Sequence, residues 1–254
     1  MKAGQTAKQQ KIRLDSLLVT RGLVDSRAKA AALAMAGKVY SGERKLEKPG
    51  TKLNPDTPLS LREAPHPWVS RGGLKLAHGL SHFSLNAAGR VALDIGASTG
   101  GFTDVLLQRG AAKIYAVDVG YGQLADKLRK DDRVIVLERT NARNLTREQV
   151  PEPAGAIVCD ASFIGLRTVL PAALALAGPG AFLLALIKPQ FEAGRSRVGK
   201  GGIVRDPAVH AEVCDEIRDW LAAQPGWQVQ GICDSPITGA EGNKEFLLAG
   251  TFAA

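Results

Sequence analysis

The chain has 254 residues, of which 45% are hydrophobic, 23% charged and 5% aromatic, which is ordinary for a soluble globular protein with a buried core. So few aromatic residues argue against recognition of single strands by rows of exposed rings. Cys159, Cys214 and Cys233 share no CxxC spacing, and no apolar signal segment follows the basic N-terminus, so we expect a cytoplasmic protein without a disulfide framework.

The net charge of +8 is concentrated in the first third of the chain. Residues 1–75 contain 15 Lys and Arg against 6 Asp and Glu, whereas residues 76–254 contain 18 against 19. A basic segment beside a near-neutral remainder is the pattern of a protein that binds a polyanion at a place separate from its chemistry. The plain alternative is a solvated basic surface that only keeps the protein soluble.

Residues 1–63 are predicted to form a small α+β domain, and residues 64–73, with two prolines and two glycines, an interdomain linker. Asp25 and Ser26 are a helix N-cap signal, and Gly37 is a plausible helix end. The predicted elements are a helix within 12–23, a helix over 27–36, a strand at 38–40 before a turn at 41–43, and a strand at 57–61.

Residues 74–254 alternate apolar strands with helical patterns, which predicts an α/β, Rossmann-like domain with a mostly parallel seven-stranded sheet. The last two strands have little between them and suggest a closing hairpin at the sheet edge. The predicted strands are Val91–Ile95, Lys113–Val117, Arg133–Leu137, Ala156–Asp160, Ala181–Ile187, Gln228–Cys233 and Glu245–Thr251, and the predicted helices are Leu74–Phe83, Gly101–Arg109, Gln123–Lys130, Leu166–Ala177 and Pro207–Gln224.

One stretch, Val169–Ile187, is uncharged over 19 residues, close to the length of a membrane-spanning helix. Pro171 and the run Gly178-Pro179-Gly180 would break such a helix in lipid. We therefore expect a helix, a turn and a buried strand, and no membrane association.

A glycine-rich turn between a strand and a helix, LDIGASTGGFT, is the most informative local motif. Ser98 stands where a dinucleotide fingerprint needs its second glycine, and no P-loop lysine is present. The turn therefore favours a methyl donor without a pyrophosphate. The cofactor-binding candidates are Asp94, Gly96, Ala97, Ser98, Gly100, Gly101 and Phe102 in the turn, Asp118 on a ribose (or as the N-cap of the next helix), Asn141 near an adenine, and Asp160.

Four ionisable residues, Lys75, Asp160, Lys188 and Glu245, lie at the ends of predicted elements. Because ligands collect beyond the carboxyl ends of parallel strands, we expect Asp160, Lys188 and Glu245 at one edge of the sheet. Surface ion pairs are the alternative for any single one of them. Cys159 and Ser162 near Asp160 have no paired histidine, and the four histidines are scattered, so we predict neither a nucleophilic triad nor a metal site.

The glycine-rich basic stretch Glu192–Arg205 has no clear periodicity. We expect a mobile loop that closes on RNA through residues such as Arg195 and Arg197, with a plain surface insertion as the alternative.

Two segments resemble known families. Residues RLDSLLVTRGLVDSRAKAAALAMAGKVYSGERKLEKPG are similar to the RNA-binding domain of the fourth small-subunit ribosomal protein, and the Lys–Asp–Lys–Glu set resembles that of FtsJ-like RNA ribose methyltransferases. With VSRGGLKL, VDVGYGQL, RTNAR and IKPQFEAG, the whole chain resembles the TlyA family. The resemblance implies RNA contacts from Arg13, Arg21, Arg27, Lys29, Lys38, Arg44, Lys45 and Arg71.

The resemblance implies S-adenosylmethionine-dependent 2′-O-methylation of a cytidine in ribosomal RNA, free or in ribosomal subunits. Because the chain ends soon after its last predicted strand, we expect large-subunit RNA first, with small-subunit RNA second. A lysine can accept the hydroxyl proton only as a neutral amine, which a second amine and burial favour and acidic partners oppose. Lys188 is the candidate base or hydroxyl-orienting group, with Lys75, Asp160 and Glu245 around it. The alternatives are a non-catalytic ribosome-assembly factor and a cytolysin, since some family members are labelled haemolysins.

Overall fold

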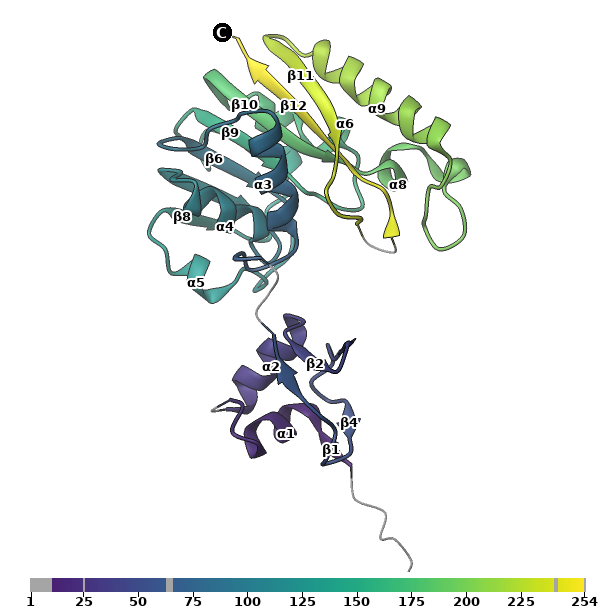
Figure 1. The fold of residues 1–254 in the computed structure, drawn as a ribbon. Coiled ribbons are helices and arrows are strands. Elements are labelled where there is room, and N and C mark those ends of the chain that lie inside the picture. The colour runs from purple at the N-terminus through teal and green to yellow at the C-terminus, as the bar shows by residue number, and fades with distance from the viewer. Residues whose placement is uncertain (1–10, 25, 63–65, 240–241, 254) are drawn as a thin grey trace, which may run out of the picture. The chain divides into compact units, whose positions relative to one another are not determined.

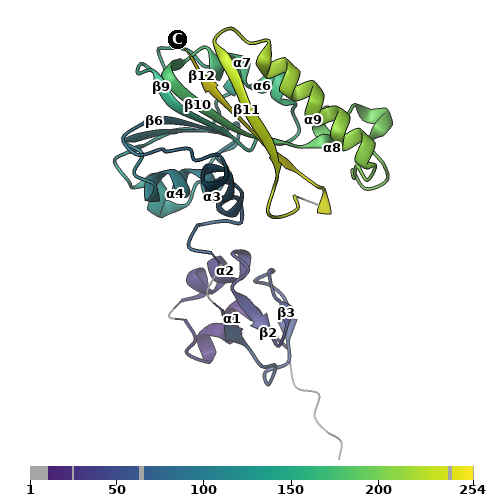
Figure 2. The ribbon, with the colours of Figure 1, turned by 45° about the horizontal axis from the view of Figure 1, so that its top comes forward.

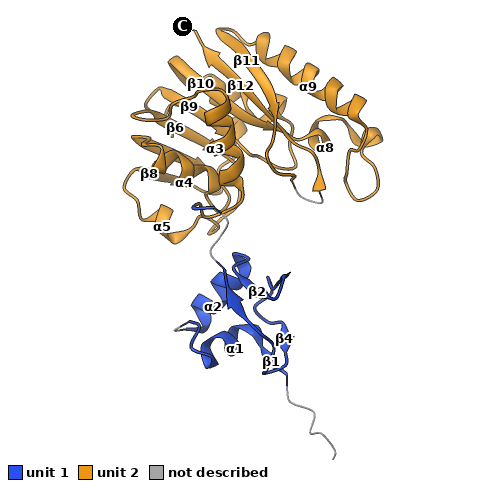
Figure 3. Cartoon of the chain, in the orientation of Figure 1, with its two compact units in different colours: residues 1–67 blue, residues 68–254 orange. Residues whose placement is uncertain are grey.

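A computed structural model describes residues 11–24, 26–62, 66–239 and 242–253 (Figure 1). The chain divides into two compact units, residues 1–67 and 68–254 (Figure 3). The division between Pro67 and Trp68 lies inside the segment predicted as a linker. Asp25, half of the predicted N-cap signal, lies outside the described residues.

The first unit is built on two helices, α1 (Leu14–Thr20) and α2 (Arg27–Met35). Ser26 caps α2, since its hydroxyl accepts a hydrogen bond from the Lys29 backbone N–H at 3.2 Å. Helix α1 ends at Thr20, so the helix predicted within 12–23 is shorter than the spacing of its apolar residues suggested. The strands are β1 (Ile12–Arg13), β2 (Val39–Ser41), β3 (Arg44–Lys45), β4 (Lys52–Leu53) and β5 (Ser60–Leu61).

The second unit contains a seven-stranded sheet in the order β11-β12-β10-β9-β6-β7-β8 (Figure 2). Strands β8, β7, β6, β9 and β10 run parallel, and β12 and β11 complete one edge as an antiparallel pair. The predicted parallel sheet with a closing edge hairpin is confirmed. The bounds are β6 (Val91–Ile95), β7 (Lys113–Val117), β8 (Val134–Leu137), β9 (Ala154–Cys159), β10 (Ala177–Ile187), β11 (Trp227–Asp234) and β12 (Phe246–Phe252).

Helices cover both faces of this sheet, as strand–helix alternation predicts. The helices form two groups, and each group packs against its own face of the sheet through a separate apolar cluster. The first group is α3 (Gly72–His82), α4 (Gly101–Gln108) and α5 (Asp126–Arg129); the second includes α6 (Leu166–Val169), α7 (Pro171–Leu174) and α9 (Pro207–Ala222), with the short α8 (Pro189–Glu192) after β10.

Three predicted elements differ from the structure. The single helix predicted over Leu166–Ala177 is two short helices, because Pro171 has no N–H for a continuous helix and instead begins α7. The turn predicted at residues 178–180 lies within β10, where the register with β9 shifts between Ala177 and Phe182. The helix predicted over Gln123–Lys130 is the single turn α5, and the chain before it bends at residues 119–122 without forming a helix. Within the described ranges, no helix is long and apolar enough to cross a membrane.

Helix α3 begins at Gly72, two residues before the helix predicted from Leu74. A side chain at Gly73 would place its Cβ 2.6 Å from atoms of the Trp68 side chain, so only glycine fits this first turn. The Val69 N–H donates to the Asp104 carboxylate of α4 at 2.8 Å. The segment 68–71 is thereby fixed onto the second unit and sets the position of α3.

Candidate active site

A cavity of about 870 Å³ opens in the second unit beyond the carboxyl ends of β6, β9 and β10. Parallel strands present their carboxyl ends at one edge of a sheet, where the following loops leave a crevice. Three loops meet here: residues 96–102 after β6, residues 160–163 after β9, and residues 188–191 after β10. The start of α3 completes the wall together with Thr238, Gly239, Gly242, Asn243 and Glu245, which precede β12.

The glycine-rich turn forms one wall of the cavity with its backbone. Gly96 has φ +83°, and a Cβ there would lie 2.9 Å from the Ala161 backbone. A Cβ at Gly101 would lie 2.2 Å from the Ser70 hydroxyl oxygen. These two positions require glycine because neighbouring backbone and side chains approach so closely. Gly96, Ala97, Ser98, Gly101 and Phe102 line the cavity as residues of the predicted cofactor turn.

Gly100, Asp118 and Asn141, also predicted at the cofactor, do not line the cavity. The missing side chain of Gly100 makes room for Leu128. Asp118 accepts hydrogen bonds from the N–H groups of Ser98 at 2.8 Å and Gly120 at 2.7 Å. It therefore fixes the glycine-rich turn through Ser98. The predicted contact of Asp118 with a ribose stays a prediction, whereas the alternative that it caps the next helix is wrong, since Ala125 precedes α5.

Asn141 occupies a capping position outside the cavity. Its side-chain oxygen accepts from the Arg143 N–H at 3.1 Å at the start of the short 3₁₀ helix η1 (Ala142–Asn144). The proximity of Asn141 to an adenine stays a prediction.

Asp94 lies at the end of β6 and is completely buried beneath the turn. The Thr103 hydroxyl donates to its Oδ2 at 2.6 Å, and its Oδ1 has no hydrogen-bond partner. Burial raises the pKa of Asp94 to about 7; the Thr103 hydrogen bond opposes this rise, and the nearby charge of Asp160 adds to it. Asp94 therefore lies buried beneath the turn and is not part of the cavity wall.

The structure brings all four predicted ionisable residues together in the cavity. The register of β10 and β12 sets Ile187 opposite Phe246, which places Lys188 and Glu245 side by side at the sheet edge. Lys75 Nζ lies 2.6 Å from Glu245 Oε2 and 3.7 Å from Asp160 Oδ2, and Lys188 Nζ lies 2.6 Å from Asp160 Oδ1. The charges alternate in the order Glu245, Lys75, Asp160, Lys188.

Three members of this group are almost inaccessible, with 7% of Lys75, 6% of Lys188 and 3% of Glu245 exposed. Such burial distinguishes the group from surface ion pairs, which are solvated and contribute little. A buried charge needs partners of opposite charge around it. The alternative that these are independent surface pairs is therefore wrong.

The Lys188 ammonium donates hydrogen bonds to the Asp160 carbonyl oxygen at 3.1 Å and to Ser162 Oγ at 2.8 Å. It is also ion-paired with Asp160 Oδ1 at 2.6 Å. Ser162 is thus a hydrogen-bond partner of Lys188. Burial raises the pKa of the Cys159 thiol to about 12, which disfavours its nucleophilic thiolate form.

Two aromatic residues that were not predicted as site residues, Phe163 and Phe191, also line the cavity. Their ring centroids are 5.2 Å apart, and 90% of Phe163 is exposed. Phe163 also has φ +66°, a conformation that is costly for a bulky residue. The signal that could have identified Phe163 is its position in the sequence, three residues after Asp160.

The basic residues predicted to contact RNA have mixed surroundings in the first unit. Arg13 and Arg27 both contact the buried carboxylate of Asp15, at 2.8 and 3.2 Å, and the hydrogen bond from Arg13 holds the pKa of Asp15 well below its usual range. Arg21 donates to the carbonyl oxygens of Pro55 and Thr57. Of the others in this unit, Lys29, Arg44 and Lys45 are exposed and Lys38 is half-buried.

In the second unit, Arg71 lines the cavity and donates to the Thr238 carbonyl at 2.7 Å. Arg195 is exposed, whereas Arg197 is paired with Glu212 of α9 at 2.8 Å. Within the stretch 192–205, the Val204 N–H donates a hydrogen bond to the Asn243 side chain. Gly201 and Gly202 of the same stretch line the cavity. Closure of this loop on RNA stays a prediction.

Comparison with known proteins agrees with this geometry. Residues 68–252 match the model of the FtsJ-like methyltransferases, and residues 12–58 match that of the S4 domain. The chain is 53% identical to YqxC of Bacillus subtilis, covering 94% of this chain and 85% of that protein. It is 48% identical to the 16S/23S rRNA (cytidine-2′-O)-methyltransferase TlyA of Mycobacterium tuberculosis, covering 94% and 89%.

A solved structure from Streptococcus thermophilus, described as a hemolysin, is also similar. It has a TM-score of 0.75 and 42% sequence identity, covering 96% of this chain and 90% of that one. The two family matches and the similarity over almost the whole chain lead to one assignment: this chain belongs to the FtsJ-like methyltransferase family, carries an S4 domain before its methyltransferase domain, and is related to TlyA.

Proposed function

We propose that this protein methylates the ribose 2′-hydroxyl of a cytidine in ribosomal RNA, with S-adenosylmethionine as the methyl donor and large-subunit RNA as the first expected substrate. The observation that carries this proposal is the buried alternation of Glu245, Lys75, Asp160 and Lys188 in one cavity beside the glycine-rich turn. TlyA of Mycobacterium tuberculosis is named for both 16S and 23S rRNA, so small-subunit RNA is the second candidate.

The cavity suits an adenosyl cofactor. Its wall from Gly96 to Ser98 is a turn whose glycine lets the backbone approach a ligand closely. Gly96, Ala97, Ser98, Gly101 and Phe102 would hold the cofactor, and Asp118 would fix the turn through Ser98. When bound, S-adenosylmethionine supplies an electrophilic methyl group on a positively charged sulfur.

Lys188 would position the ribose hydroxyl. Its Nζ donates to the Asp160 carbonyl and to Ser162 Oγ and is ion-paired with Asp160 Oδ1, so a ribose oxygen reaches it most directly by replacing the Ser162 hydroxyl, the neutral side chain among these partners. In its neutral form Lys188 would accept the hydroxyl proton as the new oxygen–carbon bond forms. Asp160 and the Lys75–Glu245 pair would keep its amine fixed, and alignment of this kind can supply roughly 7–11 kcal/mol of the barrier reduction.

Phe163 would stack on the target base. Its exposed ring lies on the wall of the same cavity, within one loop of Asp160. Sequence-specific RNA recognition commonly stacks unpaired bases on aromatic side chains. The cost of the positive φ at Phe163 is understandable if this loop is shaped to present the ring.

The basic S4 domain would bind the ribosomal RNA around the target through its phosphates. The excess positive charge of the chain lies in residues 1–75, and exposed side chains such as Arg44 and Lys45 belong to this unit. Phosphate contacts position a protein without selecting sequence. Selection of the nucleotide would then belong to the cavity.

The direct test is methyl transfer. The purified chain is incubated with labelled S-adenosylmethionine and with bare rRNA, small subunits or large subunits from cells that lack the enzyme. We expect label at a cytidine ribose in large-subunit RNA, located by mass spectrometry of nuclease fragments. Label on a base, or no label in any of these RNAs, would contradict the proposal.

A further inference from the structure

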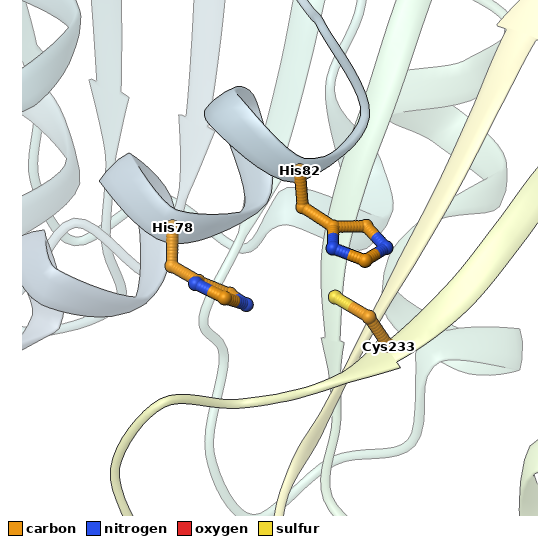
Figure 4. A group of neighbouring side chains, drawn as sticks. All are labelled: His78, His82 and Cys233. Carbon is orange, nitrogen blue, oxygen red and sulfur yellow. The ribbon is translucent and has the colours of Figure 1, made fainter.

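A second group of potential ligands lies outside the cavity just described. His78 and His82 belong to α3 and Cys233 to β11, and none of the three lines the cavity. One ligand atom from each residue lies within 4.8 Å of the other two (Figure 4). We propose that His78, His82 and Cys233 form a binding site for a divalent transition metal, with Zn²⁺ as its best-suited ion.

The local structure explains why these side chains meet. Residues four apart lie on the same face of a helix, one turn above the other, which aligns His78 and His82. Their ring centroids are 5.8 Å apart with the planes inclined by 32°. Cys233 packs with the apolar cluster on the α3 face of the sheet, whereas its neighbour Ile232 packs with the cluster on the opposite face. Strand alternation thus directs the thiol toward the histidines.

The ligand chemistry fits zinc. Two imidazole nitrogens and one thiolate are typical zinc ligands, with bond lengths of about 2.0–2.1 Å to nitrogen and about 2.3 Å to sulfur, and a fourth position can be taken by water. Tetrahedral coordination at those lengths separates the ligand atoms by roughly 3.3–3.8 Å. Small rotations of exposed histidine side chains would close the present distances to that range.

The thiol would lose its proton on binding. Zinc bound to the thiolate would replace that proton, which leaves to solvent. The two histidines are exposed, so the ion can reach the site without opening the core.

The site would tie α3 to the edge strand β11. Helix α3 also carries Lys75, one turn before His78, so a metal at its end would steady the element that presents Lys75 to the cavity. No metal site was predicted from the sequence, because the four histidines are scattered along it. His82 and Cys233 are 151 residues apart, and only the fold brings them together. The competing description is a packing cluster, in which the His82 ring lies edge-on to Phe83 at 4.6 Å.

The experiment uses the full chain, reduced, stripped of metal and without a polyhistidine tag. Co²⁺ is added as a spectroscopic probe and Zn²⁺ as its competitor. We expect one equivalent of Co²⁺ to produce a thiolate-to-cobalt charge-transfer band that one equivalent of Zn²⁺ removes. Cys233→Ser should abolish the band, and His78→Ala and His82→Ala should each weaken Zn²⁺ binding by about 10-fold or more.

Cys214→Ser is the matched control, because Cys214 lies on α9 and outside the cluster; it should keep the band. Thermal unfolding without metal checks that each variant folds, and Zn²⁺ should raise the melting temperature of the unaltered chain but not of Cys233→Ser. Absence of the band, its survival in Cys233→Ser, or equal Zn²⁺ affinities across the variants would overturn the proposal. None of these results depends on methyl transfer.

Discussion

Lys75 and Glu245 are 170 positions apart in the chain, yet Lys75 Nζ donates to Glu245 Oε2 at 2.6 Å. The pair joins the first turns of α3 to the residue before β12, and both side chains are almost completely buried. A buried ion pair of this kind is costly to break from one side, because the remaining charge has lost its partner.

We therefore expect Glu245→Ala to lower the free energy of unfolding by about 3–5 kcal/mol, since Lys75 keeps only the more distant Asp160. The double variant Lys75→Met, Glu245→Leu should lose less, because no lone charge stays buried. Urea unfolding followed by circular dichroism measures both. A double variant that is less stable than Glu245→Ala would contradict this account of the pair.

Lys188 and Ser162 should differ sharply in their effect on methyl transfer. If the ribose hydroxyl replaces Ser162 Oγ at Lys188, Ser162→Ala should change kcat less than about 10-fold, whereas Lys188→Ala should lower it by about 10²–10⁴-fold. Single-turnover assays measure the step, and calorimetry should give the same cofactor affinity for both variants. Full activity in Lys188→Ala would remove the role proposed for that residue.

Phe163→Ala should impair recognition of the target nucleotide without disturbing the fold, because 90% of the residue is exposed. Loss of one stacked base costs about 1–3 kcal/mol, so kcat/KM for RNA should fall roughly 5–150-fold. Phe163→Trp keeps a stacking surface and should retain most of the activity. An unchanged kcat/KM in Phe163→Ala would exclude stacking on this ring.

The stability of the protein should depend on Asp94 in a defined pH window. The pKa of Asp94 is raised from 3.8 to about 7, so between these values the folded chain keeps a proton that the unfolded chain releases. The free energy of unfolding therefore falls as pH rises from about 4 to about 7, and this decline ends above pH 7.

Asp94→Asn lacks this titration. Its free energy of unfolding, relative to that of the unaltered chain, should increase from pH 4.5 to about pH 7 and then stay level up to pH 8. Urea unfolding at several pH values measures the difference, which separates the titration from any constant cost of the amide. Parallel curves for the two proteins would show that Asp94 is ionised throughout.

Substitutions of two arginines of the S4 domain should have different effects, one on RNA binding and the other on stability. Arg44 is exposed, whereas Arg21 donates to two backbone carbonyls of its own unit. Arg44→Ala should weaken RNA binding and reduce the slope of log K against log salt by about 0.7–0.9, without lowering the melting temperature. Arg21→Ala should lower the melting temperature. An unchanged salt slope in Arg44→Ala would remove Arg44 from the RNA contacts.

The sequence by itself determined the class of the protein and most of its elements. Strand and helix periodicities are local, so β6 and β7 have the predicted bounds and the parallel sheet follows from their alternation. The glycine-rich turn could also be recognised from the sequence, since glycines mark sharp turns, and the structure explains them by crowding from the Ala161 backbone at Gly96 and from the Ser70 hydroxyl at Gly101. The prediction failed at Pro171, where one long helix was expected and two short helices are found. A proline can either break a helix or begin a new one, so the residue alone does not distinguish the two.

Only the tertiary structure decided which side chains meet. Lys75, Asp160, Lys188 and Glu245 were nameable one by one, but the register between β10 and β12 sets their spacing and burial. The group of His78, His82 and Cys233 could not be predicted from the sequence for the same reason, because its members come together only where α3 packs near the edge strand β11. Contacts between distant segments arise from packing, which no local pattern of residues records.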